Sequence, residues 1–218
     1  MLEFAAGPRR DARNTVQRIG AILVIVAGAC GGAVYAGHVH IYSGNFNLRI
    51  PAELSNSKGW MADAIIEVPD HFVISDLDIG VTLTHESLFD LQILLQSPKG
   101  TNVSLNPAGN LAFIVRGEDG RLSAYGGSVE WVFDDEAEVS IEQATEPFAG
   151  AFRPVESLSS FDEQDAYGFW RLRIYDAFYN DTGTFNRFEL MITAPEPAAF
   201  FLLALGVCLM RWHRPRYN

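Results

Sequence analysis

Hydrophobic and polar residues alternate with a period of two at several places in the middle of the chain. The clearest segments, each with apolar residues at every second position, are 76–83, 91–95, 170–175 and 187–192. This alternation is typical of strands that bury one face. We find no comparably convincing 3.6-residue stripe outside the two terminal apolar runs, so the pattern predicts several short strands joined by turns, as in a β-sandwich or barrel.

The N-terminal apolar run predicts a secretory signal peptide. Four arginines precede the run Ile19–Ala36, which ends in Val34-Tyr35-Ala36, a small-residue cleavage motif. We expect a signal helix over residues 1–36 with cleavage after Ala36. An uncleaved membrane anchor is the alternative, because the run is about as long as a short membrane helix. Glycines at positions 28, 31 and 32 weaken such a helix and favour cleavage.

The C-terminus has three parts in order: a Pro-Glu-Pro motif, a run of thirteen apolar residues and an arginine cluster. These are Pro195, Glu196 and Pro197, then 198–210, then Arg211, Arg214 and Arg216. The run is short for a stable span, and the arginines would keep its end cytoplasmic. The arrangement resembles the PEP-CTERM sorting signal of Gram-negative bacteria. That resemblance implies that residues 194–218, with a short membrane helix, are processed by an exosortase during export to the cell surface or medium.

Charge and cysteine content limit what the middle of the chain can do. Between residues 37 and 193 there are 9 basic and 24 acidic residues, a net charge of −15. Such a surface repels phosphates and anionic lipid, which excludes nucleic acid as an expected partner. The two cysteines, Cys30 and Cys208, lie inside the terminal runs, so the middle has neither a disulfide framework nor a thiolate metal site.

The middle of the chain also resembles a known family, the P domain (Homo B domain) of kexin/furin-type proprotein convertases. The ordered blocks that carry the resemblance are 81–85, 90–91, 97–101, 133–137, 147–154, 158–161, 168–172 and 181–184. The resemblance covers roughly residues 45–193, and we place the domain at 37–193. It implies a jelly-roll β-sandwich of the galactose-binding-like type. In the convertases this domain follows a subtilisin-like catalytic domain and supports its folding and stability.

The sequence predicts no catalytic residues. The histidine and serine motifs of a subtilisin-like site are absent, and the sequence around Ser128 departs from the nucleophile elbow at its last position. Asp181-Thr182-Gly183 resembles the aspartic-protease triplet, but it has no second copy and is better explained as a turn before the last strand. We expect His85 to be structural, hydrogen-bonded to a group such as Asp90.

Acidic residues concentrated in the predicted turns suggest a calcium site, since carboxylates are hard oxygen ligands. The candidate ligands are Asp90, Asp134, Asp135, Glu136, Asp176 and Asp181. The alternative is that they are solvated, or that Asp134 and Asp135 cap backbone amides. Their spacing matches no named calcium loop.

Aromatic residues suggest a second kind of contact, because sandwiches that bind carbohydrate stack sugars on exposed rings. The available rings are Trp60, Tyr125, Trp131, Phe178 and Tyr179. Burial in the core is the default for the tryptophans, and Phe178-Tyr179 in its polar turn is the pair expected to be exposed.

Three hypotheses about function follow. The first is a non-catalytic surface protein sorted by an exosortase and built on one P domain. The second is an accessory module acting on a subtilisin-like serine endopeptidase. The third is an extracellular carbohydrate-binding module. The sequence does not identify the partner, whether it is another protein or a polysaccharide.

Overall fold

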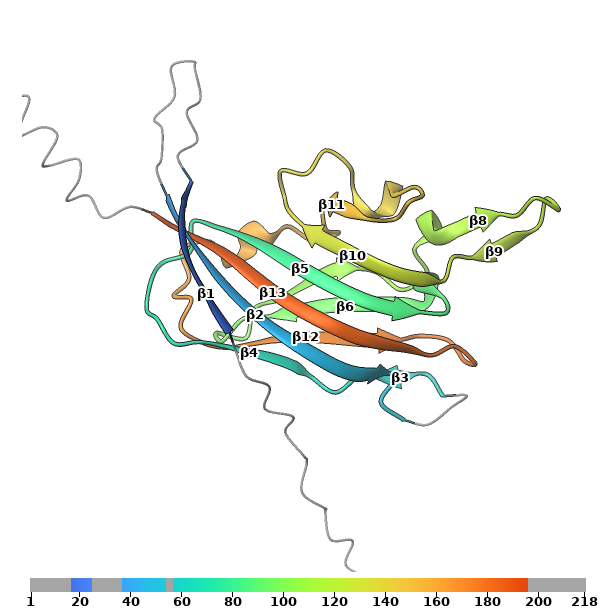
Figure 1. Ribbon diagram of the computed structural model, residues 1–218, viewed down its shortest axis with the longest axis horizontal. Coiled ribbons are helices and arrows are strands. Elements are labelled where there is room, and N and C mark those ends of the chain that lie inside the picture. The colour runs from blue at the N-terminus through green and yellow to red at the C-terminus, as the bar shows by residue number, and fades with distance from the viewer. Residues whose placement is uncertain (1–16, 25–36, 54–56, 196–218) are drawn as a thin grey trace, which may run out of the picture.

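The computed structural model describes residues 17–24, 37–53 and 57–195, and in them the regular secondary structure is β-strand apart from four short 3-10 turns (Figure 1). The larger sheet has six strands in the order β1-β2-β13-β5-β10-β11, which are Gln17–Val24, Gly37–Ile50, Gly183–Pro195, Asp76–His85, Gly127–Phe133 and Gly150–Phe152. The smaller sheet has five: β3 (Gly59–Trp60), β12 (Gly168–Asp176), β6 (Leu91–Gln96), β7 (Asn102–Asn106) and β4 (Ala64–Val68), which also pairs with β12.

The remaining elements are short. A two-stranded hairpin joins β8 (Ile114–Arg116) to β9 (Leu122–Ala124) and projects from one end of the sandwich (Figure 1). Four single 3-10 turns lie in the connections: η1 (Leu88–Asp90), η2 (Leu111–Phe113), η3 (Ile141–Gln143) and η4 (Leu158–Phe161). None of the helices in the described ranges has the length and hydropathy that a membrane span requires.

The period-two segments are all strands, so the prediction of an all-β sandwich is confirmed. β5, β6, β12 and β13 cover the four alternating segments, and the apolar residue of each pair points into one common core. Two buried tryptophans anchor that core. The indole N–H of Trp131 donates to the carbonyl oxygen of Phe148 at 3.0 Å, and that of Trp170 donates to Ala166 at 2.9 Å. A large ring is thus buried without leaving its polar atom unpaired.

The segment predicted as an N-terminal signal helix is described only over residues 17–24. Gln17–Val24 forms β1, which pairs antiparallel with β2 at the edge of the larger sheet. An unpaired edge offers free backbone donors and acceptors, and the β-branched residues of this segment favour an extended chain. Residues 25–36, the predicted cleavage site, Glu196 and everything after it lie outside the described residues, so both processing signals stay predictions.

Candidate functional site

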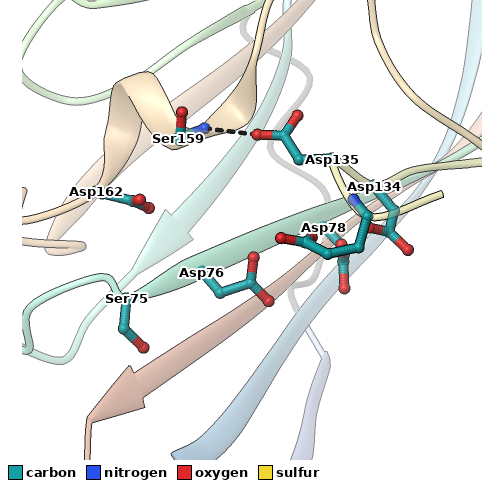
Figure 2. Close-up of a pocket in the computed structure, with 8 residues that line it drawn as sticks. Ser75, Asp76, Asp78, Asp134, Asp135, Ser159 and Asp162 are labelled. Carbon is teal, nitrogen blue, oxygen red and sulfur yellow. Dashed lines mark hydrogen bonds between the residues drawn. The ribbon is translucent and has the colours of Figure 1, made fainter. Parts of the chain in front are cut away.

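A cleft of about 330 Å³ opens on the outer side of the six-stranded sheet (Figure 2). Its lining is almost entirely acidic and consists of Ser75, Asp76, Asp78, Asp134, Asp135, Glu136, Ser159 and Asp162. These residues come from the start of β5, the turn after β10 and the region of η4. Three segments far apart in the sequence therefore meet at one surface.

Strand register explains why the carboxylates converge. Asp76 and Asp78 alternate with the buried Leu77 and Ile79, so their side chains point away from the core. In the pairing of β5 with β10, Ile79 lies opposite Phe133. The turn that begins at residue 134 consequently emerges beside the first residues of β5.

Hydrogen bonds give Asp135 a structural role in this cleft. Its carboxylate accepts from the backbone N–H groups of Leu158 and Ser159, each at 3.0 Å, and from the hydroxyl of Ser157. A carboxylate in this position satisfies donors at the start of η4, as a capping residue does. Asp134 accepts from the N–H of Glu136 at 2.7 Å. Both Asp134 and Asp135 therefore accept hydrogen bonds from backbone amides, as the alternative to calcium binding expects.

Burial, with a smaller contribution from neighbouring like charges, makes ionisation of the cleft carboxyl groups costly. Burial raises the pKa of Asp78 to about 7, with a further contribution from the carboxylate of Asp76. Burial also raises the pKa values of Asp76, Glu136 and Asp162, and neighbouring carboxylates add to each shift. Burial and like charge thus favour the protonated form of these carboxyl groups.

A second polar group is buried inside the sandwich, at the end of β5 and β12. Both the imidazole of His85 and the carboxylate of Asp176 are fully buried, with Nε2 and Oδ2 3.5 Å apart. The ring's Nδ1 lies 2.8 Å from the carbonyl oxygen of Ser87 and 3.1 Å from the backbone nitrogen of the same residue, so the tautomer decides whether Nδ1 donates to the first or accepts from the second. Burial raises the pKa of Asp90 to about 6, and the carboxylates of Asp181 and Asp176 also raise it.

The structure thus divides the six candidate calcium ligands into two groups. Asp134, Asp135 and Glu136 line the cleft, whereas Asp90, Asp176 and Asp181 lie near His85. Sequence reasoning missed Asp76, Asp78 and Asp162 as members of the first group. Within the described ranges no three His, Cys, Asp or Glu side chains are arranged to hold a metal ion, so calcium stays a prediction.

The expected structural role for His85 agrees with its burial, but its expected partner was wrong. The carboxylate beside Nε2 belongs to Asp176 rather than Asp90. The two strands β5 and β12 lie in different sheets, and the core packing that brings their ends together has no local sequence signal. The ring is closed off from solvent.

The aromatic candidates also separate by burial. Phe178 and Tyr179 are 45% and 56% exposed, as expected for their turn, and Trp131 is buried in the core. Trp60 departs from the expectation for tryptophans, because it is 39% exposed at the edge strand β3. Tyr125 is partly buried against Phe148.

These features define an acidic β-sandwich in which the conspicuous histidine is buried and structural. The chain belongs to the proprotein convertase P-domain family, whose family model matches residues 74–192. No curated protein matches the chain.

Among solved structures, the chain is similar to a serine protease of Aeromonas sobria, both with its chaperone ORF2 and alone. The sequence identities are 14% and 15%, the TM-scores 0.41 and 0.40, and 84% and 83% of this chain is covered. The chain spans only 28% and 27% of the length of those chains. A third structure, PfGH50B, has 7% identity, a TM-score of 0.34, and coverage of 85% and 23%. Similarities this weak carry no argument about function.

Proposed function

We propose that this chain is a non-catalytic P-domain module that a Gram-negative bacterium exports and an exosortase sorts to the cell surface or medium. The observation that carries the non-catalytic part is the environment of its histidines and serines. His85 is enclosed in the core, and the hydroxyl of Ser128 lies 2.7 Å from that of Thr84. The exposed His71 pairs with Asp165 at 2.7 Å and stacks on Tyr167.

The sorting part of the proposal rests on the C-terminal sequence. Pro195 ends β13, and Pro197 two residues later lacks an N–H, so the strand cannot continue through the motif. An extended segment just outside a bilayer suits cleavage by a membrane-embedded protease. The apolar run 198–210 would span about 20 Å as a helix, less than the roughly 30 Å hydrocarbon core. That deficit fits a transient intermediate better than a permanent anchor.

The test is the intact mass of the mature protein from a host with an exosortase and from a strain lacking that enzyme. We expect loss of the residues after the Pro-Glu-Pro region only when the exosortase is present. Retention through Asn218 in both strains would show that the segment is an ordinary anchor. Peptide hydrolysis by the purified protein, tracking with the domain, would overturn the non-catalytic assignment.

A second function is favoured by family membership itself. P domains are associated with subtilisin-like proteases, so this chain would act on such an enzyme supplied by another gene. Co-purification of a serine endopeptidase whose activity or folding depends on this chain would establish it. A protease that folds and works equally well without the chain would argue against it.

A further inference from the structure

The polar group buried at the end of β5 and β12 has fewer hydrogen bonds than its atoms can make. His85, Asp90 and Asp176 are 1%, 4% and 0% exposed. His85 Nε2, Asp90 Oδ2 and Asp176 Oδ2 are all buried, and none of the three makes a hydrogen bond within the described residues. A buried polar atom without a partner costs free energy, and an ionised carboxylate costs more than a neutral carboxyl group. A proton taken up by this group therefore lowers the cost of burying it.

Three carboxyl groups from different segments meet beside the imidazole. Asp90 comes from η1, Asp176 ends β12, and Asp181 lies in the turn 177–182 between β12 and β13. The carboxyl groups of Asp90 and Asp181 are within hydrogen-bonding reach of each other. Two carboxyl groups form such a bond only when one of them holds a proton, and two ionised groups repel each other.

A fourth acid contacts the same turn from the other side. The carboxylate of Glu86 accepts from the backbone N–H of Thr182 at 2.8 Å and from its hydroxyl at 3.3 Å. These hydrogen bonds favour the ionised form of Glu86. The titratable groups that face Asp90 and the turn are thus one imidazole, which is His85, and three acids, which are Glu86, Asp176 and Asp181.

The buried group also holds the turn by its backbone. Asp176 Oδ1 accepts from the N–H of Phe178 at 3.2 Å, and the carbonyl oxygen of Asp90 accepts from the N–H of Ala177 at 3.0 Å. The ring of Phe178 lies 5.5 Å from that of Phe89, the residue before Asp90. Any movement that separates Asp90 from the turn must break these contacts.

We propose that this buried group is a pH-sensitive latch on the turn 177–182, closed when Asp90 and Asp181 share a proton and loosened when both are ionised. In the ionised state the carboxylates of Asp90, Asp176 and Asp181 repel one another without solvent to screen them. Asp181 belongs to the turn, so the repulsion is relieved when the turn moves outward. The latch does not depend on the export or sorting of the chain.

The turn presents the exposed aromatic pair, so the latch acts on a surface that a partner can reach. Phe178 and Tyr179 are 45% and 56% exposed. In the closed state Phe178 packs on Phe89. Opening the turn frees this ring and makes the aromatic pair mobile, so the pH of the medium sets how firmly the pair is held.

The direction of the pH effect follows from Asp90. Burial raises its pKa to about 6, Asp181 and Asp176 raise it further, and a hydrogen bond from Ser87 partly opposes the shift. The ordinary value is near 4, so between these values the closed turn binds more protons than an open turn in which Asp90 meets water. The stability that the proton gives the closed turn is fully present below pH 4 and is lost as the pH rises through 6. A shift of this size makes opening about tenfold more frequent at pH 7.5 than at pH 5.

The test is hydrogen–deuterium exchange of the full chain in mild detergent at pH 5 and pH 7.5, corrected for the intrinsic effect of pH on exchange. The amides of Ala177 and Phe178 report on the latch, and those of Leu172 and Ile174 in β12 report on opening of the whole sandwich. We expect the latch amides to exchange faster than the β12 amides at both pH values. Their protection should fall about tenfold from pH 5 to pH 7.5.

The variant Asp90→Asn keeps the shape of the side chain but cannot ionise, so it should retain at pH 7.5 the protection that the wild type has at pH 5. Asp181→Asn should act in the same direction, which keeps the test decisive if Asp90→Asn does not fold. The control Asp78→Asn removes a buried acid on the other sheet and should leave the tenfold change at the latch intact.

Equal protection of the wild-type latch amides at both pH values would overturn the proposal. So would a tenfold change that persists in Asp90→Asn or Asp181→Asn, or one that disappears equally in Asp78→Asn. Latch amides that exchange no faster than those of Leu172 and Ile174 would also overturn it, because the turn would then open only when the whole sandwich unfolds.

Discussion

Among single residues, Gly183 shows most directly how the core constrains the sequence. A Cβ at this position would lie 2.3 Å from the carbonyl oxygen of Thr84 and 2.4 Å from Cδ2 of His85. Both distances are far below contact, and the nearest atoms belong to backbone and to a buried ring. Only glycine lets β13 start this close to the end of β5.

Replacing Gly183 by alanine should therefore destabilise the sandwich. Overpacking of this kind costs about 1–3 kcal/mol, which lowers the midpoint of thermal unfolding by roughly 2–4 °C per kcal/mol in a domain of this size. Gly59→Ala is the control, because its Cβ would meet only Pro51 at an ordinary 3.7 Å. Equal melting temperatures for Gly183→Ala and Gly59→Ala would contradict the assigned close approach.

Asp78 links stability to pH. Burial raises its pKa to about 7, above the ordinary value near 4, so between these values the folded state binds more protons than the unfolded state. Stability contributed by the protonated group is present below pH 4 and is lost as the pH rises toward 7. The full chain should therefore melt at a lower temperature at pH 7.5 than at pH 5.

The variant Asp78→Asn keeps the shape of the side chain but cannot ionise. It should melt at a higher temperature than the wild type at pH 7.5, with a smaller difference at pH 5. The slope should be reduced rather than abolished, because the pKa values of Asp76, Glu136 and Asp162 are also raised. Parallel pH profiles for Asp78→Asn and for the exposed control Glu118→Gln would refute the linkage.

Among elements, η4 depends on the turn that follows β10. The carboxylate of Asp135 accepts from two backbone N–H groups and a hydroxyl at the start of this 3-10 turn. Asp135→Ala should cost about 2 kcal/mol, because capping contacts and hydrogen bonds to charged groups are each of this order. Chemical unfolding of the full chain measures it. A loss no larger than that of Asp119→Ala in the exposed hairpin would show that the contacts contribute little.

Calcium binding belongs to the same elements. A cation that binds only the folded state stabilises it by mass action, so excess calcium should raise the melting temperature at pH 7.5 relative to a chelator. Asp134→Asn should reduce the effect at the cleft, and Asp181→Asn should reduce it if the buried group is responsible. Identical melting curves with calcium and with chelator would eliminate both sites.

The sequence predicts the strands well but not which strands and turns lie next to one another, and the reason is physical. The alternation of Leu77 and Ile79 with Asp76 and Asp78 is local, so it predicts a strand and even the outward direction of both carboxylates. Which turn lies beside them depends on the register between β5 and β10, which are more than 40 residues apart. The acidic cleft and the pairing of His85 with Asp176 are long-range features of this kind.

At the scale of the molecule, the segment Gly37–Pro195 contains, of the residues that the structure describes, every strand except β1 and all of the hydrophobic core. We expect this segment to fold alone as a cysteine-free, mostly β monomer, since β1 only extends one edge of the larger sheet. Far-UV circular dichroism and a cooperative melt would show it. A spectrum dominated by helix or disorder would mean that the flanking segments are needed for folding.

The pairing of β2 with β13 has a mechanical consequence. Gly37 lies opposite Pro195, so the segment between them begins and ends at neighbouring points of the sheet, roughly 5 Å apart. If both flanks enter a bilayer, two chain segments attach the domain to the membrane. The thirteen residues of β13 then place its far end about 40 Å from that attachment. Cutting either flank leaves the other attached. Release into the medium then requires cleavage of both flanks, and the protease that acts second determines when the protein is released.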